Sequence, residues 1–257
     1  MKKLSIILLA AALFPLVAKS AFALTGDEIL KRAEEAMNAP QDRTVTEKMV
    51  LIKADGSEKE RTIRFYQKGN DKRLVVFLSP ADIKGVGFLS LSKDRMYLYL
   101  PAFRKVRRIA SHIKNEDFMG TDFSYENMAE TKYTADYLAI LQQAQDSALE
   151  KEDPNQYILE LKPRPGVDVS YSRQRMWVDK ETFIPAKTEY FSPGGKLVKV
   201  LTYENIEKVD GYWFPMKMTM ETVKTEHRTV LEVLEIKHDS GLADNFFTER
   251  NLKRQAR

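Results

Sequence analysis

The stretch that decides the fold runs from Tyr212 to Glu221 and reads YWFPMKMTME. One face of this stretch is apolar, with Phe214, Met216, Met218 and Met220, and the other face carries Trp213, Lys217, Thr219 and Glu221. Alternation with a period of two predicts a β-strand. Methionine is flexible and polarizable, so the apolar face is suited either to an ordinary core or to a wall that adapts to bound molecules.

Two further stretches show the same division. Met96, Leu98 and Leu100 alternate with Arg95, Tyr97 and Tyr99, and Ile63 and Phe65 alternate with Thr62, Arg64 and Tyr66. A sheet of such strands has one apolar side, which helices can fill as core or which can line a cavity. The residues expected to line a hydrophobic cavity are Phe65, Met96, Leu98, Trp177, Phe214, Met216, Met218 and Met220.

Short runs rich in β-branched and aromatic residues predict about a dozen strands in two blocks. The first block comprises Thr44 to Ile52, Glu60 to Lys68, Arg73 to Leu78, Gly87 to Ser92, Arg95 to Leu100 and Arg104 to Ile109. The second comprises Gln156 to Lys162, Tyr171 to Val178, Pro185 to Phe191, Leu197 to Glu204, Tyr212 to Glu221 and Thr229 to Lys237. Separators such as Asp55-Gly56 and Asp210-Gly211 favour antiparallel hairpins. So many strands do not form one flat sheet, so we expect the sheet to curl or close.

The helical signals are few. Thr25 and Glu28 form a capping box that predicts a helix from Asp27 to Asn38. A short helix is expected near Tyr125 to Ala129, and Leu242 to Leu252 is expected to form a short helix or tail. The stretch Tyr133 to Leu149 fits a helix, although its start fits a strand equally well. The fold class expected is mainly β with a few helices.

The N-terminus has the pattern of a cleaved secretory signal. Lys2 and Lys3 precede an apolar run from Leu4 to Val17, and Ala21-Phe22-Ala23 is a cleavage site of small residues. We therefore expect residues 1–23 to be removed after Ala23 and residues 24–257 to form a single domain in the periplasm. The apolar run is shorter than the roughly 20 residues that span a bilayer, which argues against a membrane anchor.

Charge and cysteine content narrow the classes of function. The formal net charge of +4 falls to +1 without the three lysines of the leader, so no nucleic-acid partner is expected. The chain has no cysteine, which excludes a disulfide and a lipid attached at an N-terminal cysteine. We expect a soluble monomer stabilised by its core.

Catalytic motifs are scarce. The three histidines form no H-E-x-x-H pair, and neither a G-x-S-x-G elbow nor a Walker loop is present. Glu116, Asp117, Asp122 and Glu126 form an acidic cluster that could ligate a hard cation or supply paired carboxylates for a hydrolase. Because their spacing matches no calcium loop, the interpretation favoured here is a solvated loop, in a protein with no enzymatic activity, no cofactor and no metal.

A basic run lies beside one predicted strand. Arg104, Lys105, Arg107 and Arg108 place four cations within five positions. They could contact lipid phosphates or an acidic partner. Charges on a solvated edge strand that prevent aggregation explain the run equally well.

The stretch from Arg95 to Ile109, followed by Asp117 to Glu126, resembles the LolA-like outer-membrane lipoprotein-sorting proteins, in particular the branch associated with RND-type exporters. The resemblance spans nearly the whole chain after the leader. It implies an N-terminal helix packed on a strongly bent antiparallel sheet, an incomplete barrel whose concave apolar side is covered by helices and loops. It also implies a lipid, acyl-chain or lipoprotein ligand.

Two functions follow as hypotheses. The first is a periplasmic carrier that binds a lipid or a lipidated protein between the sheet and a lid, for transfer across the cell envelope. The second is an accessory or sensor module that docks on an inner-membrane RND-type exporter or a regulatory protein, with the basic run from Arg104 to Arg108 as its contact surface.

Overall fold

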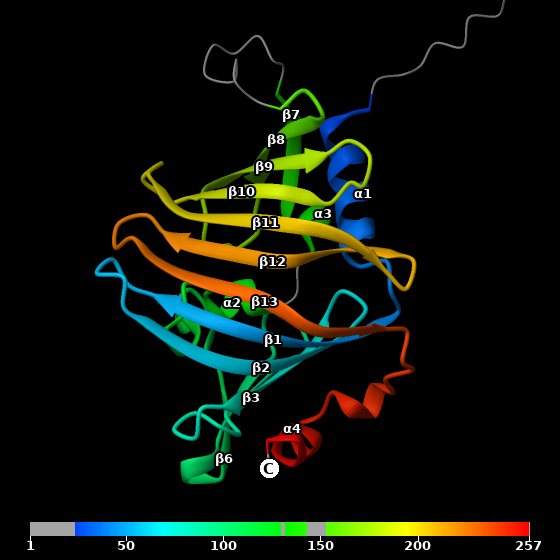
Figure 1. The fold of residues 1–257 in the computed structure, drawn as a ribbon. Coiled ribbons are helices and arrows are strands. Elements are labelled where there is room, and N and C mark those ends of the chain that lie inside the picture. The colour runs from blue at the N-terminus through cyan, green and yellow to red at the C-terminus, as the bar shows by residue number, and fades with distance from the viewer. Residues whose placement is uncertain (1–23, 130–131, 143–152, 257) are drawn as a thin grey trace, which may run out of the picture.

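One curved antiparallel sheet dominates the computed structural model, which describes residues 24–129, 132–142 and 153–256 (Figure 1). The predicted leader and its cleavage site lie outside the described residues. Thirteen strands form the sheet in the order β6-β5-β4-β3-β2-β1-β13-β12-β11-β10-β9-β8-β7. The two halves of the chain are therefore two meanders that join where β1 pairs with β13. The sheet stays open, with β6 and β7 as its edges.

The predicted strands are confirmed, with small changes at their ends. The first block forms β1 Asp42–Ile52, β2 Glu58–Lys68, β3 Lys72–Ser79, β4 Gly87–Ser90, β5 Met96–Leu100 and β6 Lys105–Arg108. The second forms β8 Gln156–Pro163, β9 Arg173–Asp179, β10 Pro185–Phe191, β11 Leu197–Val209, β12 Tyr212–Thr222 and β13 His227–His238. At the turn between β11 and β12, Asp210 and Gly211 both have positive φ, as expected for a tight hairpin.

The thirteenth strand comes from the ambiguous stretch. Its start forms a short helix, α3 Tyr133–Asp136, which passes directly into the edge strand β7 Tyr137–Leu141. Residues 143–152, which include most of the rest of that stretch, lie outside the described residues. Both alternatives for the stretch are thus present in part, one after the other.

Helix α1, Gly26–Met37, packs on the concave face at the β7 end of the sheet. The predicted capping box between Thr25 and Glu28 is present. Ile29, Leu30 and Ala33 are fully buried against the inward side chains of β8 and β9. A Cβ on Gly26 would lie 2.3 Å from the carbonyl oxygen of Ala139, so only glycine allows the start of the helix to approach β7 this closely.

The chain between the two sheet edges fills a large part of the concave side. Residues 110–129, called the plug here, run from β6 toward α3 and include the short helix α2, Tyr125–Met128. This helix lies behind the sheet in Figure 1. Phe118, which is fully buried, contacts the rings of Phe77, Phe88 and Tyr125 at centroid distances of 5.8, 5.3 and 5.5 Å. The plug therefore belongs to the main core.

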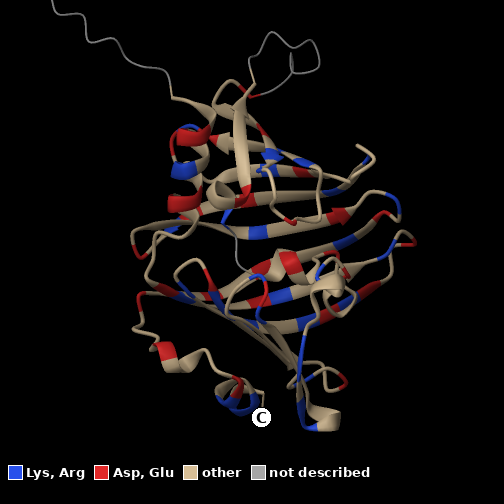
Figure 2. Ribbon diagram, turned by 180° about the vertical axis from the view of Figure 1, so that it is seen from behind, with Lys and Arg blue, Asp and Glu red and all other residues tan. Residues whose placement is uncertain are grey.

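Both faces of the sheet are covered near β3 to β5, although the sequence predicts only one apolar face. The C-terminal helix α4, Glu249–Gln255, follows a short 3-10 turn, Asp244–Phe246. With Phe247 it packs on the face opposite the plug, against Leu74, Leu89 and Tyr99. No helix in the described ranges is long and apolar enough to cross a membrane. Figure 2 shows acidic and basic residues interspersed along the strands.

Candidate ligand-binding cavity

A cavity of about 240 Å³ lies on the concave face beside the plug. Its walls come from the inward side chains of β1 to β3 and β9 to β13, from Met37 and Asn38 at the end of α1, from the plug and from α3. The strands hold these side chains in fixed rows, because directly paired residues of antiparallel strands lie on the same face. The cavity is therefore a gap between the sheet and the helices that cover it.

One part of the wall is apolar. In the register of the sheet, Met220 pairs with Leu201 and Thr229, and Met218 pairs with Tyr203 and Leu231. The apolar side chains that line the cavity are Met37, Phe65, Phe123, Met128, Ile184, Leu201, Trp213, Phe214, Pro215, Met218, Met220 and Leu231. This wall can hold a hydrocarbon chain, because burial of apolar surface stabilises by roughly 25 cal/mol per Å².

The other part of the wall is polar. Arg43 on β1 pairs with Gln67 on β2, and Gln67 pairs with Arg73 on β3, so three adjacent strands present one polar row to the cavity. Arg43 is 6% exposed, donates to the carbonyl of Met37 and lies 5.2 Å from the centroid of the Phe214 ring. Burial, and then the nearby Arg73 cation, lower the pKa of Arg43 to about 10, so it stays charged at neutral pH.

Glu47 is a buried carboxyl group in the same wall. Its residue is 4% exposed, and no hydrogen bond joins its side chain to another residue of the described part of the chain. Burial raises its pKa to about 7, and the Arg43 cation opposes this rise. The pKa of Glu47 therefore lies close to neutral pH.

Five tyrosines complete the lining: Tyr133, Tyr137, Tyr171, Tyr190 and Tyr203. Burial raises the pKa of each phenol, so all five are neutral at physiological pH. Each hydroxyl can donate or accept a hydrogen bond. The cavity thus combines an apolar wall with uncharged hydroxyl groups, the row of Arg43, Gln67 and Arg73, and further ionisable residues, namely Glu47, Glu126, Lys132 and Asp136.

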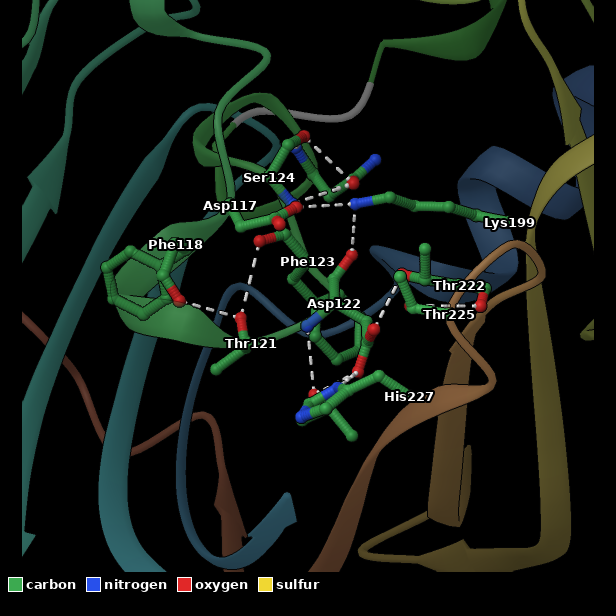
Figure 3. A network of polar contacts seen from close by, with 12 residues as sticks. Asp117, Phe118, Thr121, Asp122, Phe123, Ser124, Lys199, Thr222, Thr225 and His227 are labelled. Atoms are coloured by element: carbon green, nitrogen blue, oxygen red, sulfur yellow. Dashed lines mark hydrogen bonds and ion pairs between the residues drawn. The ribbon is translucent and has the colours of Figure 1, made fainter. Parts of the chain in front are cut away.

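Asp122 fastens the plug to the β12–β13 hairpin (Figure 3). This 3% exposed carboxylate accepts hydrogen bonds from Thr222 Oγ1 at 2.6 Å and from Thr229 Oγ1 at 2.7 Å, and it lies 2.7 Å from His227 Nδ1. Lys199 on β11 adds two contacts, 2.9 Å to the carboxylate of Asp117 and 2.5 Å to the carbonyl of Asp122. The plug is therefore held by buried polar contacts as well as by packing.

The four acids of the predicted cluster do not converge on one site. Asp122 and Asp117 bind the hairpin side, Glu126 lines the cavity and accepts from the backbone N–H of Ser170, and Glu116 is exposed. Among residues 24–129, 132–142 and 153–256, no group of three or more histidine and acidic residues could hold a metal ion. The interpretation of this segment as a solvated loop is wrong for Asp122 and Glu126, because Asp122 is 3% exposed and Glu126 lines the cavity.

Comparison with known proteins now identifies the family. A family model described as uncharacterized protein matches residues 69–254. The crystal structure of a DUF1329 family protein from Desulfovibrio piger is 30% identical, with a TM-score of 0.79, and the match covers 88% of this chain and 97% of that one. The chain belongs to the DUF1329 family.

The same fold occurs in LolA-like proteins. A putative outer membrane lipoprotein-sorting protein domain from Vibrio parahaemolyticus is 29% identical, with a TM-score of 0.79 and coverage of 89% of this chain and 98% of that one. A LolA superfamily protein from Nitrosomonas europaea is 24% identical, with a TM-score of 0.74 and coverage of 89% and 100%. No curated protein matches. The predicted resemblance to the LolA superfamily is confirmed.

In this DUF1329 family member, four of the eight predicted wall residues line the cavity, namely Phe65, Phe214, Met218 and Met220. Met216 is half-buried on the same strand and does not line it. Met96 and Leu98 face the concave side, but they pack in the core beneath the plug. Their predicted contact with a ligand has no support from this placement, because the plug covers that part of the face.

Trp177 lies on the face of β9 that points away from the cavity. Its neighbours Met176 and Val178 pack with α1, whereas Trp177 packs against Ile158 and beneath the ammonium group of Lys187, 4.2 Å from the ring centroid. Gln174 lies on the same face of β9 as Met176 and Val178, and it is the residue of this strand that lines the cavity. The strand was correctly predicted, but the face on which Trp177 lies could not be deduced from its apolar character.

The polar row was missed at the level of sequence, although it leaves a signal there. On β1, Arg43 and Glu47 lie on the same face of the strand as the apolar residues Val45, Met49 and Leu51. Two ionisable residues within an apolar period-two pattern indicate buried ionisable groups, which are costly unless they are paired, hydrogen-bonded or neutralised. The tyrosines left no such signal, since tyrosine is common on both faces of strands.

The predicted basic run lies away from the cavity. Arg104 is the left-handed residue before β6, and Lys105, Arg107 and Arg108 are exposed on this edge strand. The Arg107 guanidinium lies 5.5 Å from the ring centroid of Phe103, which is 60% exposed. None of the four cations lines the cavity, so contact with the headgroup of a ligand bound there has no support from their placement.

Proposed function

We propose that this protein is a non-enzymatic periplasmic carrier that binds a lipid, or the acyl chain of a lipidated protein, in the cavity between the sheet and its covering helices. The observation that carries the proposal is the apolar wall around Met218 and Met220, which borders a cavity on the concave face. The relationship to proteins named for lipoprotein sorting supports it. Residues 1–23 would direct export, with cleavage after Ala23.

The physical task of a carrier fits this wall. Each buried methylene contributes roughly 0.8 kcal/mol, so a chain of about 14 carbons costs on the order of 10 kcal/mol to keep in water. A carrier needs an apolar, deformable surface that offsets this cost and still releases its ligand. Methionine side chains supply such a surface, because they repack easily around different shapes.

The size of the cavity adds a requirement. Its volume of about 240 Å³ is below the roughly 300–1,000 Å³ of pockets for drug-sized molecules. A complete lipid with more than one chain therefore requires the cavity to widen. The helices on the concave side are the parts able to move, since the sheet is one continuous hydrogen-bonded unit.

Extraction and binding test the proposal together. We expect organic extracts of gently purified protein to contain a lipid by mass spectrometry, and the emptied protein to bind a fluorescent fatty acid. Met218→Trp fills part of the cavity and should weaken this binding about tenfold. Met216→Trp, on the same strand but outside the lining, is the matched control and should bind as wild type.

Absence of lipid from repeated extracts, together with no binding of the fluorescent fatty acid by wild type, would refute the carrier. Equal weakening by both substitutions would show that the loss comes from the strand and not from the cavity. Melting temperatures of both variants separate either result from unfolding.

A second candidate function is docking of this module on an inner-membrane RND-type exporter or a regulatory protein. The exposed cations of β6 favour it, because this edge strand has no further strand beside it and none of its cations forms an ion pair within the described residues. An acidic strand or loop of a partner would complement such an edge. Charge reversal on β6, described below, distinguishes this surface from the cavity.

A further inference from the structure

The cavity has a polar end and an apolar end, set by the register of the sheet. His238, Arg43, Gln67 and Arg73 are paired neighbours on β13, β1, β2 and β3, and the last three line the cavity. The next row on the same face consists of Val45, Phe65 and Val75. A molecule that spans both rows would meet cations and amides at one end and hydrocarbon beyond them.

The polar end carries two cations close together. Arg43 and Arg73 are near enough that the cation of Arg73 lowers the pKa of Arg43. Both guanidinium groups donate to backbone carbonyls of the covering segments, Arg43 to Met37 and Arg73 to Ala129. For Arg43, this neutral carbonyl oxygen satisfies a hydrogen-bond donor without neutralising the charge of the guanidinium group.

Arg43 has no carboxylate partner within ion-pair distance in the described part of the chain. Glu47, the acid of the same strand face, forms no ion pair with Arg43 in the described part of the chain, and burial raises its pKa, which favours its neutral form. A buried cation is costly unless an anion accompanies it. The cavity is thus arranged so that a bound anion would remove an existing electrostatic cost.

We propose that the cavity selects amphiphiles with an anionic head, a carboxylate or a phosphate, and that the row of Arg43, Gln67 and Arg73 binds this head while the chain lies along Met218 and Met220. The proposal rests on the carrier function and names the chemical class of its ligand. Guanidinium groups bind carboxylate and phosphate in a bidentate geometry, which fixes the head. The neutral tyrosine hydroxyls can donate to its remaining oxygens.

The preference for an anionic head group is tested with three probes that carry the same monounsaturated hydrocarbon chain and differ in their head group: oleate, oleoyl lysophosphatidate and oleyl alcohol. Each is titrated against a fluorescent fatty acid bound to the lipid-free protein at low salt. We expect the anionic probes, or one of the two, to bind about tenfold more tightly than the alcohol. Preference for oleate identifies the carboxylate and preference for lysophosphatidate the phosphate.

Arg43→Met should reduce the preference to less than about twofold and leave the affinity for oleyl alcohol unchanged. Arg64→Met is the matched control, since Arg64 lies on β2 with its Nε directed to Thr46 Oγ1 and does not line the cavity. If Arg43→Met fails to fold, Arg43→Lys is the substitute test. Lysine keeps the positive charge but loses the planar guanidinium group with its two parallel donors, so this variant should retain only part of the preference for anionic probes.

The outcomes separate this inference from the carrier proposal. Equal binding of all three probes by wild type would keep the carrier and overturn the anionic head. An unchanged preference in folded Arg43→Met would likewise overturn the role of the row. Binding of none of the three would refute the carrier, and the inference with it.

Discussion

The two parts of the concave face differ although the strands beneath them have the same alternating pattern. Beneath the plug, Phe118 completes a solid core with Phe77, Phe88 and Met96. Beside the plug, the face continues into a cavity with Met218 and Met220 in its wall. The difference arises from the covering segment and not from the sheet. An apolar strand face alone therefore does not distinguish core from binding site.

The two parts also treat a buried carboxyl group differently. Asp122, in the plug, accepts hydrogen bonds from two threonines and contacts His227. Glu47, in the cavity, has no hydrogen bond to the described residues, and burial raises its pKa to about 7. A buried carboxyl group with hydrogen-bond partners fixes structure, whereas one that faces a cavity marks a place where a ligand changes the energy.

The largest effect expected concerns the aromatic rings of the two parts. Phe118→Ala removes a fully buried ring from the solid core and should lower the free energy of unfolding by about 3–5 kcal/mol. Phe65→Ala removes a half-buried ring that already borders a cavity, so only the transfer energy is lost, about 1–2 kcal/mol. Urea denaturation of both variants measures the difference. Equal losses would contradict the division into a solid and an open part.

The next effect concerns the polar fastening of the plug. Asp122→Ala leaves Thr222, Thr229 and His227 without their shared acceptor and should destabilise the protein by about 3 kcal/mol. Asp117→Ala is the control, because this side chain is 61% exposed and its pair with Lys199 is worth less than about 1 kcal/mol. Similar unfolding midpoints for the two variants would show that packing alone holds the plug.

The sequence predicted the sheet well because alternation, turn residues and a capping box are local signals. It did not predict which concave residues are covered, because Met96 and Met218 have the same pattern and differ only in what lies above them. That difference depends on the path of the plug, a contact between segments far apart in the chain. The position of Trp177 was also not predicted. Its large apolar side chain suggested the concave face, but it lies on the outer face, where Ile158 and Lys187 pack against it.

A third prediction uses the raised pKa of Glu47. Its pKa is about 7 in the folded chain, against an ordinary value of 4.5, so the folded state keeps a proton that the unfolded state has released between these values. Stability therefore falls as the pH rises through this window, by up to about 3 kcal/mol in total. Glu47→Gln should remove most of this fall and stabilise the protein at about pH 8.

Thermal unfolding at about pH 5 and about pH 8 measures the effect. Glu60→Gln, whose side chain is 62% exposed on β2, is the matched control and should behave as wild type. If Glu47→Gln keeps the pH dependence of wild type, another group is responsible, and Glu47 is not the unsatisfied acid of the cavity.

The smallest effect on stability is expected at the β6 edge, which belongs to neither part of the concave face. Arg107→Glu combined with Arg108→Glu changes two exposed residues, so the free energy of unfolding should change by less than about 0.5 kcal/mol and fatty-acid binding should not change. Each cation near an anionic membrane contributes about 1 kcal/mol, so sedimentation with phosphatidylglycerol vesicles at low salt should fall at least about tenfold. Weaker fatty-acid binding by this folded variant would place the basic edge in the same functional unit as the cavity. Unchanged sedimentation would exclude β6 as a surface for anionic lipid and leave an acidic protein partner or a solvated edge as the role of its charges.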